Sequence, residues 1–257
     1  MYFPIIPFSC PSTIALLKRD QSDEENQVCQ SILVRGAGAK AFCAGGDIVS
    51  IAKDAARAQK GDGDAYQRFV GFFRDEYRLD YMTSKLSKPY IPWYNGIVMG
   101  GGVGISVHNR VRVATEQSLF AMPETTIGFF PDVGGSHFLP RLDPGLGMYL
   151  ALTSARLKGA DLVHAGVATH FAYNHEFDNL YNKLNDGHET ADYVYRALGS
   201  VSQPQELLPA FTLEKHMDCI ARCFTKGSVE QIIEALNAET GRDAAFAQVR
   251  QKLQSLS

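Results

Sequence analysis

Two carboxylate side chains, Glu124 and Asp132, stand eight positions apart among Pro, Gly, Ile and Phe residues. An apolar surrounding disfavours the ionised form of a carboxyl group and raises its basicity, which suits a general base or a nucleophile. The alternative is a structural role, in which Glu124 caps a helix or pairs with an arginine such as Arg141. Spacing alone favours the structural role, because structural ion pairs also perturb carboxylates.

Two glycine-containing loops precede these carboxylates. In the stretch 96–107 a short predicted strand runs into Gly100-Gly101-Gly102 and then into the start of a predicted helix. Glycine lets an outside group approach the backbone closely, and the N–H groups at a helix N-terminus attract negative charge. Residues 40–47, which contain Gly45 and Gly46, form a second loop of this kind. A packing turn without chemistry explains such glycines equally well, so both interpretations stay open at this point.

A third carboxylate, Glu76, lies on a long predicted helix. From residue 65 to about 85, apolar side chains recur at helical spacing, and Phe73, Tyr77 and Tyr81 surround Glu76. The simplest interpretation is a solvated carboxylate on the polar face of that helix.

The surrounding pattern predicts an α/β layered core. Short apolar runs that read as strands alternate with helical segments up to residue 142. The predicted strands are 31–35, 89–93, 111–114 and 119–122, and the first predicted helix is 48–58, with Asp47 at its start. After 142 the pattern predicts one more strand, 167–171, and the helices 178–185, 213–223, 229–237 and 243–256.

Composition excludes several classes of protein. A net charge of −3 over 257 residues offers no general basic surface for nucleic acid, and no apolar run is long enough to span a bilayer.

Five cysteines without framework spacing indicate reduced thiols. His216, Cys219 and Cys223 share a helix face, yet core packing is favoured over a metal site because no fourth ligand is evident. Residues 1–11 contain three prolines and form a poor signal peptide, and the arginine-rich pattern of a transit peptide is missing.

Taken together, the loops resemble the crotonase (enoyl-CoA hydratase/isomerase) superfamily, and within it the acyl-CoA thioester hydrolases. The segments that carry the resemblance are 40–48, 99–108, 120–135 and 138–142, and the similarity covers roughly residues 24–257. It implies an α/β fold, a crotonase-like spiral of ββα units with a helical C-terminal part. The expected organisation is an atypical lead-in at 1–23, a core at 24–171 and a helical region at 172–257. Because the family's N-terminal strand and its later helices find no match, we expect a chain truncated at both ends.

The resemblance also assigns roles to residues. It implies that the N–H groups of Gly46 and Gly101 form an oxyanion hole, and that residues 39–44, Ala44 among them, lie beside the adenine and pantetheine of CoA. Glu124 would attack the thioester carbonyl or activate a water molecule, and Asp132 would orient a 3-hydroxyl group. Glu76 matches a further substrate-contacting position. Hydratases of the family carry a second glutamate where this chain has Gly104.

The expected function is therefore hydrolysis of a short branched 3-hydroxyacyl-CoA in valine breakdown. A hydratase or isomerase of the same superfamily is one alternative. A catalytically silent chain that only binds acyl-CoA, or associates with full-length subunits, is another. We expect acyl-CoA as the ligand, no metal or redox cofactor, and no nucleic acid or membrane partner. A homo-oligomer is compatible with these expectations. The resemblance implies the mitochondrial matrix, with the cytoplasm as the alternative.

Overall fold

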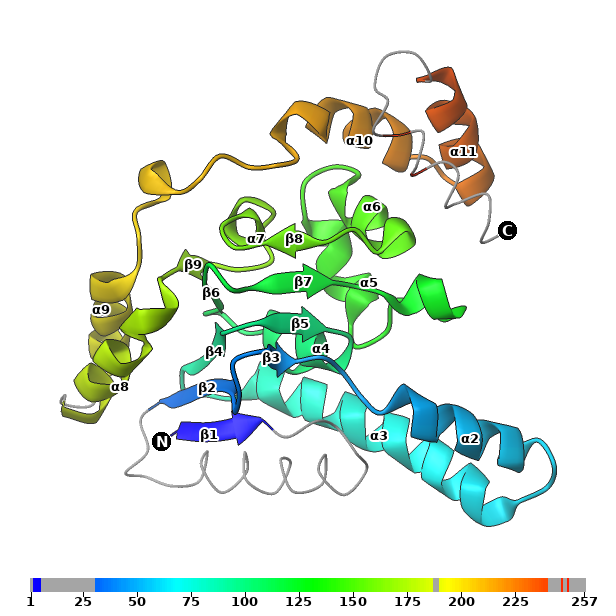
Figure 1. Cartoon of the computed structure of the whole chain (residues 1–257), viewed down its shortest axis with the longest axis horizontal. Helices are drawn as coiled ribbons and strands as arrows, with labels where there is room; N and C mark the ends of the chain where they lie inside the picture. Colours follow the sequence, from blue (N-terminus) through cyan, green and yellow to red (C-terminus); the bar gives the residue numbers. More distant parts are fainter. Residues whose placement is uncertain (1, 6–30, 187–189, 240–245, 247–248, 250–257) are drawn as a thin grey trace.

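A computed structural model describes residues 2–5, 31–186, 190–239, 246 and 249, and two β-sheets form its centre (Figure 1). The larger sheet is parallel, in the order β1 (Tyr2–Ile5), β2 (Ile32–Gly36), β4 (Tyr90–Tyr94), β6 (Val113–Ala114) and β9 (His170–Phe171). The smaller sheet has the order β3 (Ala41–Cys43), β5 (Ile97–Met99), β7 (Leu119–Ala121) and β8 (Leu157–Lys158), in which only β8 runs antiparallel.

The chain winds through the two sheets in a repeated order. Strands β2 and β3 precede the helices α2 (Ile48–Ala58) and α3 (Gly63–Lys85), and β4 and β5 precede α4 (Gly101–Val107). Strands β6 and β7 then precede the 3-10 helix η1 (Glu124–Ile127). Each unit therefore adds one strand to each sheet before it turns into a helix. This arrangement confirms the predicted α/β spiral of ββα units.

Strand β2 shows how the sequence pattern builds the core. Ile32 and Val34 pack into the cluster between the sheets and α3, while Leu33 points to the opposite face of its sheet. There it joins Trp93, Phe177 and Leu180 in a second cluster. Successive side chains of a strand point to opposite faces, so a continuous apolar run such as Ile32–Val34 is typical of a parallel strand buried on both sides.

Helices enclose the sheets. The segment after η1 contains α5 (Gly135–Phe138), η2 (Leu139–Arg141), α6 (Leu146–Thr153) and α7 (Asp161–His164). It is followed by η3 (Asn174–Glu176), α8 (Phe177–Asp186), α9 (Ala191–Val201), η4 (Gln205–Leu207), η5 (Glu214–His216), α10 (Met217–Phe224) and α11 (Val229–Ala238). Helices α8 and α9 cover the outer face of the larger sheet, and α10 packs on α6 (Figure 1). None of the helices in the described ranges has the length and hydropathy needed to cross a membrane.

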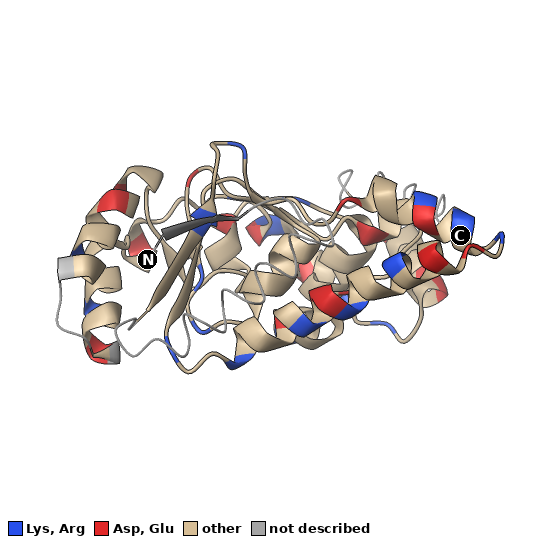
Figure 2. Cartoon of the chain, turned by 90° about the horizontal axis from the view of Figure 1, so that it is seen from below, with Lys and Arg blue, Asp and Glu red and all other residues tan. Residues whose placement is uncertain are grey.

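Helices α2 and α3 form an arm that projects from the sheets (Figure 1). An aspartate caps the start of each helix. Asp47 accepts a hydrogen bond from the backbone N–H of Ser50, and Asp62 accepts one from the backbone N–H of Ala65. Arg68 pairs with Asp54 at 2.8 Å between the two helices. Acidic and basic residues are interspersed along the helices (Figure 2). Exposed ion pairs such as Arg68–Asp54 each contribute less than about 1 kcal/mol to stability.

Several local predictions need correction. Residues 2–5, within the predicted lead-in at 1–23, form the edge strand β1, for which the sequence analysis has no counterpart. An edge strand tolerates a proline such as Pro4, which has no N–H to donate. Strand β8 has no counterpart in the sequence analysis, because two residues carry no periodicity. Helix α9 is likewise additional. The predicted helix 243–256 lies almost entirely outside the described residues.

Candidate active site

The two glycine loops lie against each other beside the smaller sheet. Strand β3 leads into Gly45 and strand β5 into Gly100, and these two strands are paired. A Cβ atom built on Gly45 would lie 3.4 Å from the backbone nitrogen of Gly101. Gly100 has φ 51° and ψ −126°, a conformation that favours glycine, and it turns the chain directly into α4. The N–H of Gly101 is the first of that helix, where no acceptor within the helix is available.

Gly46 lies against the ring of Phe72 on α3. A Cβ atom at this position would overlap the Phe72 ring, so the close approach of loop and helix requires glycine. Ala44, two residues earlier, is exposed at the outer side of the same loop. The structure thus brings the predicted donors Gly46 and Gly101 to one place and leaves Ala44 accessible to a ligand.

Glu124 lies next to this pair. It is the first residue of η1, it is 5% exposed, and a Cβ built on Gly100 would lie 3.5 Å from its Oε1. Its Oε2 atom is buried and has no hydrogen-bond partner among the described residues. Burial, with a smaller contribution from the charge of Asp132, raises the pKa of Glu124 to about 7. A carboxyl group with this pKa can accept and return a proton near neutral pH.

The structure does not pair Glu124 with Arg141, the structural partner considered above. The Arg141 guanidinium donates to the carbonyl of His137 instead. Residues 124–127 form a 3-10 turn that is closed by the left-handed Gly128.

Asp132 is held by a tyrosine of α3. The Tyr77 hydroxyl donates to Asp132 Oδ2 at 2.8 Å. Burial raises the pKa of Asp132 although the Tyr77 hydrogen bond opposes the rise. The next residue, Val133, has φ 44°, which is strained for a β-branched side chain. His108 Nε2 lies 2.9 Å from the Val133 carbonyl oxygen, and donation from this nitrogen holds the strained turn in place.

Glu76 faces the same cluster from α3. It is 3% exposed, so it is not on the solvated face that periodicity alone suggested. Burial raises its pKa to about 8, with further contributions from the charges of Asp132 and then Glu124. One turn later, Asp80 is also buried, and burial raises its pKa well above the ordinary range. Four carboxyl groups therefore share one apolar region and repel one another's charge.

Sequence reasoning missed three residues of this region: Tyr77, Asp80 and His108. Tyr77 and Asp80 follow Glu76 by one and four positions on one helix, and residues four apart share a helix face. The spacing of four was therefore a usable signal for Asp80 once Glu76 was chosen, whereas Tyr77 at the next position had no such signal. His108 offered none, because its partner Val133 is distant in sequence.

The cysteine-containing helix forms a different group. Cys219 and Cys223 have their Sγ atoms 4.0 Å apart, and the described residues place Glu239, not His216, beside them. Arg222 bonds both carboxylate oxygens of Glu239, and burial raises the pKa of Cys219 to about 12. Both thiols are buried, and the Glu239 carboxylate is held by Arg222, so this group packs within the helical region.

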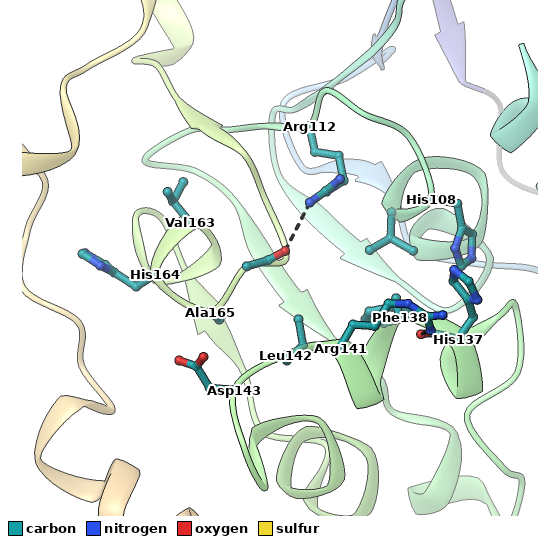
Figure 3. A pocket seen from close by; sticks show the side chains of 12 residues that line it. His108, Arg112, His137, Phe138, Arg141, Leu142, Asp143, Val163, His164 and Ala165 are labelled. Atoms are coloured by element: carbon teal, nitrogen blue, oxygen red, sulfur yellow. Dashed lines mark hydrogen bonds between the residues drawn. The ribbon is translucent and has the colours of Figure 1, made fainter. Parts of the chain in front are cut away.

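A cavity of about 420 Å³ lies beyond the C-terminal end of α4, between α5 and α7 (Figure 3). Arg112 reaches toward it but donates to the carbonyl oxygens of Gly166, Val167 and Asn109. His108 and His137 lie ring against ring at its edge, with centroids 5.9 Å apart (Figure 3). The guanidinium of Arg112 thus has a structural role, because it connects the segment that follows α4 with the segment that follows α7.

Two parallel-rich sheets wound into ββα units, with paired glycine loops beside buried carboxyl groups, define a protein of the crotonase fold. The model of the enoyl-CoA hydratase/isomerase family matches residues 12–257, and the chain belongs to this family.

Relatives with known names support this placement. The chain is 46% identical over 234 residues to "3-hydroxyisobutyryl-CoA hydrolase, mitochondrial" of Danio rerio, covering 90% of this chain and 58% of that protein. The protein of the same name from Homo sapiens is 45% identical over 242 residues, 91% of this chain and 58% of that protein. This chain therefore spans a little over half the length of these relatives.

A solved structure shares the fold as well. A carnitinyl-CoA dehydratase from Mycobacterium thermoresistibile superimposes with a TM-score of 0.81 at 34% identity, over 96% of this chain and 68% of that chain. An enoyl-CoA hydratase from Rhodobacter sphaeroides gives a TM-score of 0.77 at 29% identity, over 96% of this chain and 66% of that chain. The fold alone is thus compatible with different acyl-CoA reactions.

Proposed function

We propose that this chain hydrolyses the thioester of 3-hydroxyisobutyryl-CoA to 3-hydroxyisobutyrate and CoA, a step of valine breakdown. The observation that carries the proposal is the buried Glu124 beside Gly100 and Gly101, with a pKa raised to about 7. The names of the relatives supply the acyl group and favour a mitochondrial location.

In the proposed reaction the thioester carbonyl lies at the N–H groups of Gly46 and Gly101. Each such donor stabilises the negative charge that develops on the carbonyl oxygen by about 3 kcal/mol. Glu124 takes a proton from a water molecule or itself attacks the carbonyl carbon. In the first route the water oxygen bonds to the acyl carbon as the C–S bond breaks, CoA leaves as the thiolate, and Glu124 returns the proton to that thiolate. In the second route a Glu124 oxygen bonds to the acyl carbon as the thiolate leaves. Water then hydrolyses the resulting mixed anhydride, which frees the acid and Glu124 and supplies the proton that the thiolate takes up.

The remaining carboxyl groups handle the acyl part. Asp132, positioned by Tyr77, would bind or orient the 3-hydroxyl and assist proton transfer, and Glu76 would contact the substrate from α3. Residues 39–44, including the exposed Ala44, would lie beside the adenine and pantetheine. The scheme uses only side chains and backbone donors, and hydrolysis that is unaffected by EDTA tests the prediction that no metal is required. A homo-oligomer stays a prediction.

The test is thiol release from 3-hydroxyisobutyryl-CoA, with hydration of crotonyl-CoA followed in parallel. We expect thiol release without hydration, and a loss of at least about 100-fold in kcat for Glu124→Gln, the usual scale for a general base. The same change at exposed Glu206 is the matched control. Hydration without thiol release would assign the chain to the hydratases. A folded, monodisperse chain with no turnover would mean that it only binds acyl-CoA or associates with other subunits.

A further inference from the structure

The turn that follows Asp132 is strained. Val133 has φ 44° and Gly134 has φ 79°, so both central residues of the turn lie in the left-handed region. Glycine adopts this conformation readily, whereas a β-branched side chain such as that of Val133 adopts it only at a cost. The N–H of Gly135 closes the turn by donating to the Asp132 carbonyl oxygen at 2.6 Å. Strained backbone persists only where the surrounding structure holds it, and strain beside a candidate site residue suggests a function.

His108 holds this turn. Its Nε2 atom lies 2.9 Å from the Val133 carbonyl oxygen, and because a carbonyl oxygen can only accept, this nitrogen carries the hydrogen. Burial lowers the pKa of His108, which favours the neutral ring with a single N–H. The ring also lies so close to Gly134 that a Cβ atom built there would overlap it. The turn is therefore fixed both by a hydrogen bond and by contact with the imidazole ring.

The His108 ring is itself fixed by its neighbours. His108 directly follows α4, all of whose residues are buried. Its ring makes edge contacts with the rings of His137 and Phe138 on α5, at centroid distances of 5.9 and 6.1 Å. Figure 3 shows the rings of His108 and His137 against each other. A ring fixed in this way gives the turn a defined position relative to α4.

Asp132 is thus positioned by two helices. The Tyr77 hydroxyl on α3 donates to its carboxylate at 2.8 Å, and His108 at the end of α4 fixes the carbonyl group of the next residue. Helix α4 also begins with Gly101, the proposed donor to the thioester carbonyl. In a 3-hydroxyacyl thioester one carbon separates the carbonyl carbon from the carbon that bears the hydroxyl group. The groups that recognise the carbonyl and the hydroxyl must therefore keep a set separation, because small displacements are costly for a reaction.

We propose that His108 is a positioning residue that holds the Asp132 carboxyl group at the 3-hydroxyl of the substrate, so that the chain prefers 3-hydroxyacyl thioesters to thioesters without this hydroxyl. The inference rests on the proposed function, in which Asp132 binds or orients the 3-hydroxyl. His108 acts through Val133 and not by contact with the substrate. Without the hydrogen bond from His108, the turn relaxes toward ordinary backbone angles and the Asp132 carboxyl group moves away from the hydroxyl.

The kinetic test compares two substrates that differ in one group. 3-Hydroxyisobutyryl-CoA carries the 3-hydroxyl and isobutyryl-CoA lacks it, so the ratio of their kcat/KM values measures recognition of the hydroxyl. His108→Asn and His108→Gln introduce the same amide group, but only the longer glutamine reaches the Val133 carbonyl. We expect His108→Asn to lower the ratio at least 10-fold and His108→Gln to keep most of it. His164→Asn is the matched control, because His164 Nε2 lies 2.8 Å from the carbonyl oxygen of Pro209, outside the candidate site.

Two kinetic outcomes would overturn the proposal. Equal losses on both substrates in His108→Asn would show a merely structural residue, because general damage to the fold lowers both activities alike. A wild-type chain that hydrolyses the two thioesters with equal kcat/KM would show that the hydroxyl is not selected. Thermal melting verifies that each variant is folded at the assay temperature.

Crystal structures test the positioning without activity. In wild type and in His108→Gln we expect a positive φ at Val133 and the Tyr77 hydroxyl on Asp132. In His108→Asn we expect Val133 to leave the left-handed region and the Asp132 carboxyl group to shift. An unchanged turn in His108→Asn would refute the role of His108 whatever the chain catalyses. Wild-type chain that releases no thiol from either thioester would refute the proposed function and, with it, the substrate preference, while the turn geometry would still decide whether His108 positions Asp132.

Discussion

Replacing Glu124 by glutamine should stabilise the protein while it removes the proposed activity. Burial raises the pKa of Glu124 from its ordinary value of 4.5 to about 7. The folded protein therefore holds this proton more tightly than the unfolded chain does, and stability falls as the pH rises from 4.5 through 7. Glutamine stays neutral at every pH, so the variant does not lose stability by burying an ionised carboxylate.

The expected size follows from the same shift. At about 1.4 kcal/mol per pKa unit, the ionised carboxylate costs about 3 kcal/mol of unfolding free energy at pH 8. At pH 5 the folded protein keeps Glu124 protonated, and the cost is about 1 kcal/mol. We therefore expect Glu124→Gln to be more stable than wild type by about 3 kcal/mol at pH 8 and by about 1 kcal/mol at pH 5. The difference in unfolding free energy thus grows by about 2 kcal/mol between the two pH values.

Urea unfolding at both pH values measures these free energies. The single tryptophan, Trp93, is a fully buried residue of β4 in the second core cluster and reports unfolding by fluorescence. An unchanged dependence of the free energy on urea would show that the same surface is exposed in each variant. Glu206→Gln again controls for the loss of one negative charge. The reasoning would be refuted by a Glu124→Gln variant no more stable than wild type at pH 8, or by an equal difference at both pH values.

Three further predictions follow from contacts in the site. Asp132→Asn should move the midpoint of the pH–rate profile for thiol release below 7, because the charge of Asp132 helps to raise the pKa of Glu124; an unchanged midpoint would contradict this. Gly46→Ala should cost about 1–3 kcal/mol in urea unfolding by forcing a methyl group into the Phe72 ring, and Phe72→Leu should restore part of it, whereas additive losses would argue against the contact. Tyr77→Phe should raise the pKa of Asp132, followed by NMR of the carboxyl carbon, and cost about 1 kcal/mol for the lost hydrogen bond.

Local pattern was sufficient for the longer elements. The apolar run at 31–35 and the helical spacing at 65–85 appear as β2 and α3. A helix satisfies its backbone hydrogen bonds within the segment, and a continuous apolar run suits a parallel strand that is paired on both edges and buried on both faces. Short elements could not be predicted from periodicity. Strand β8 consists of Leu157–Lys158 and exists only because β7 offers an edge with which it can pair.

For the site, the sequence by itself determined which residue types were available. The glycines of both loops, Glu124 and Asp132 were evident from composition and motif. Which of them meet was decided by the tertiary structure, because parallel strands bring distant loops to one edge of a sheet. The pairing of β3 with β5 places Gly45 against Gly101, and the packing of α3 brings Glu76 and Asp80 into an apolar region with Glu124. Burial there raises the carboxyl pKa values, and burial depends on how distant segments pack rather than on neighbours in the chain.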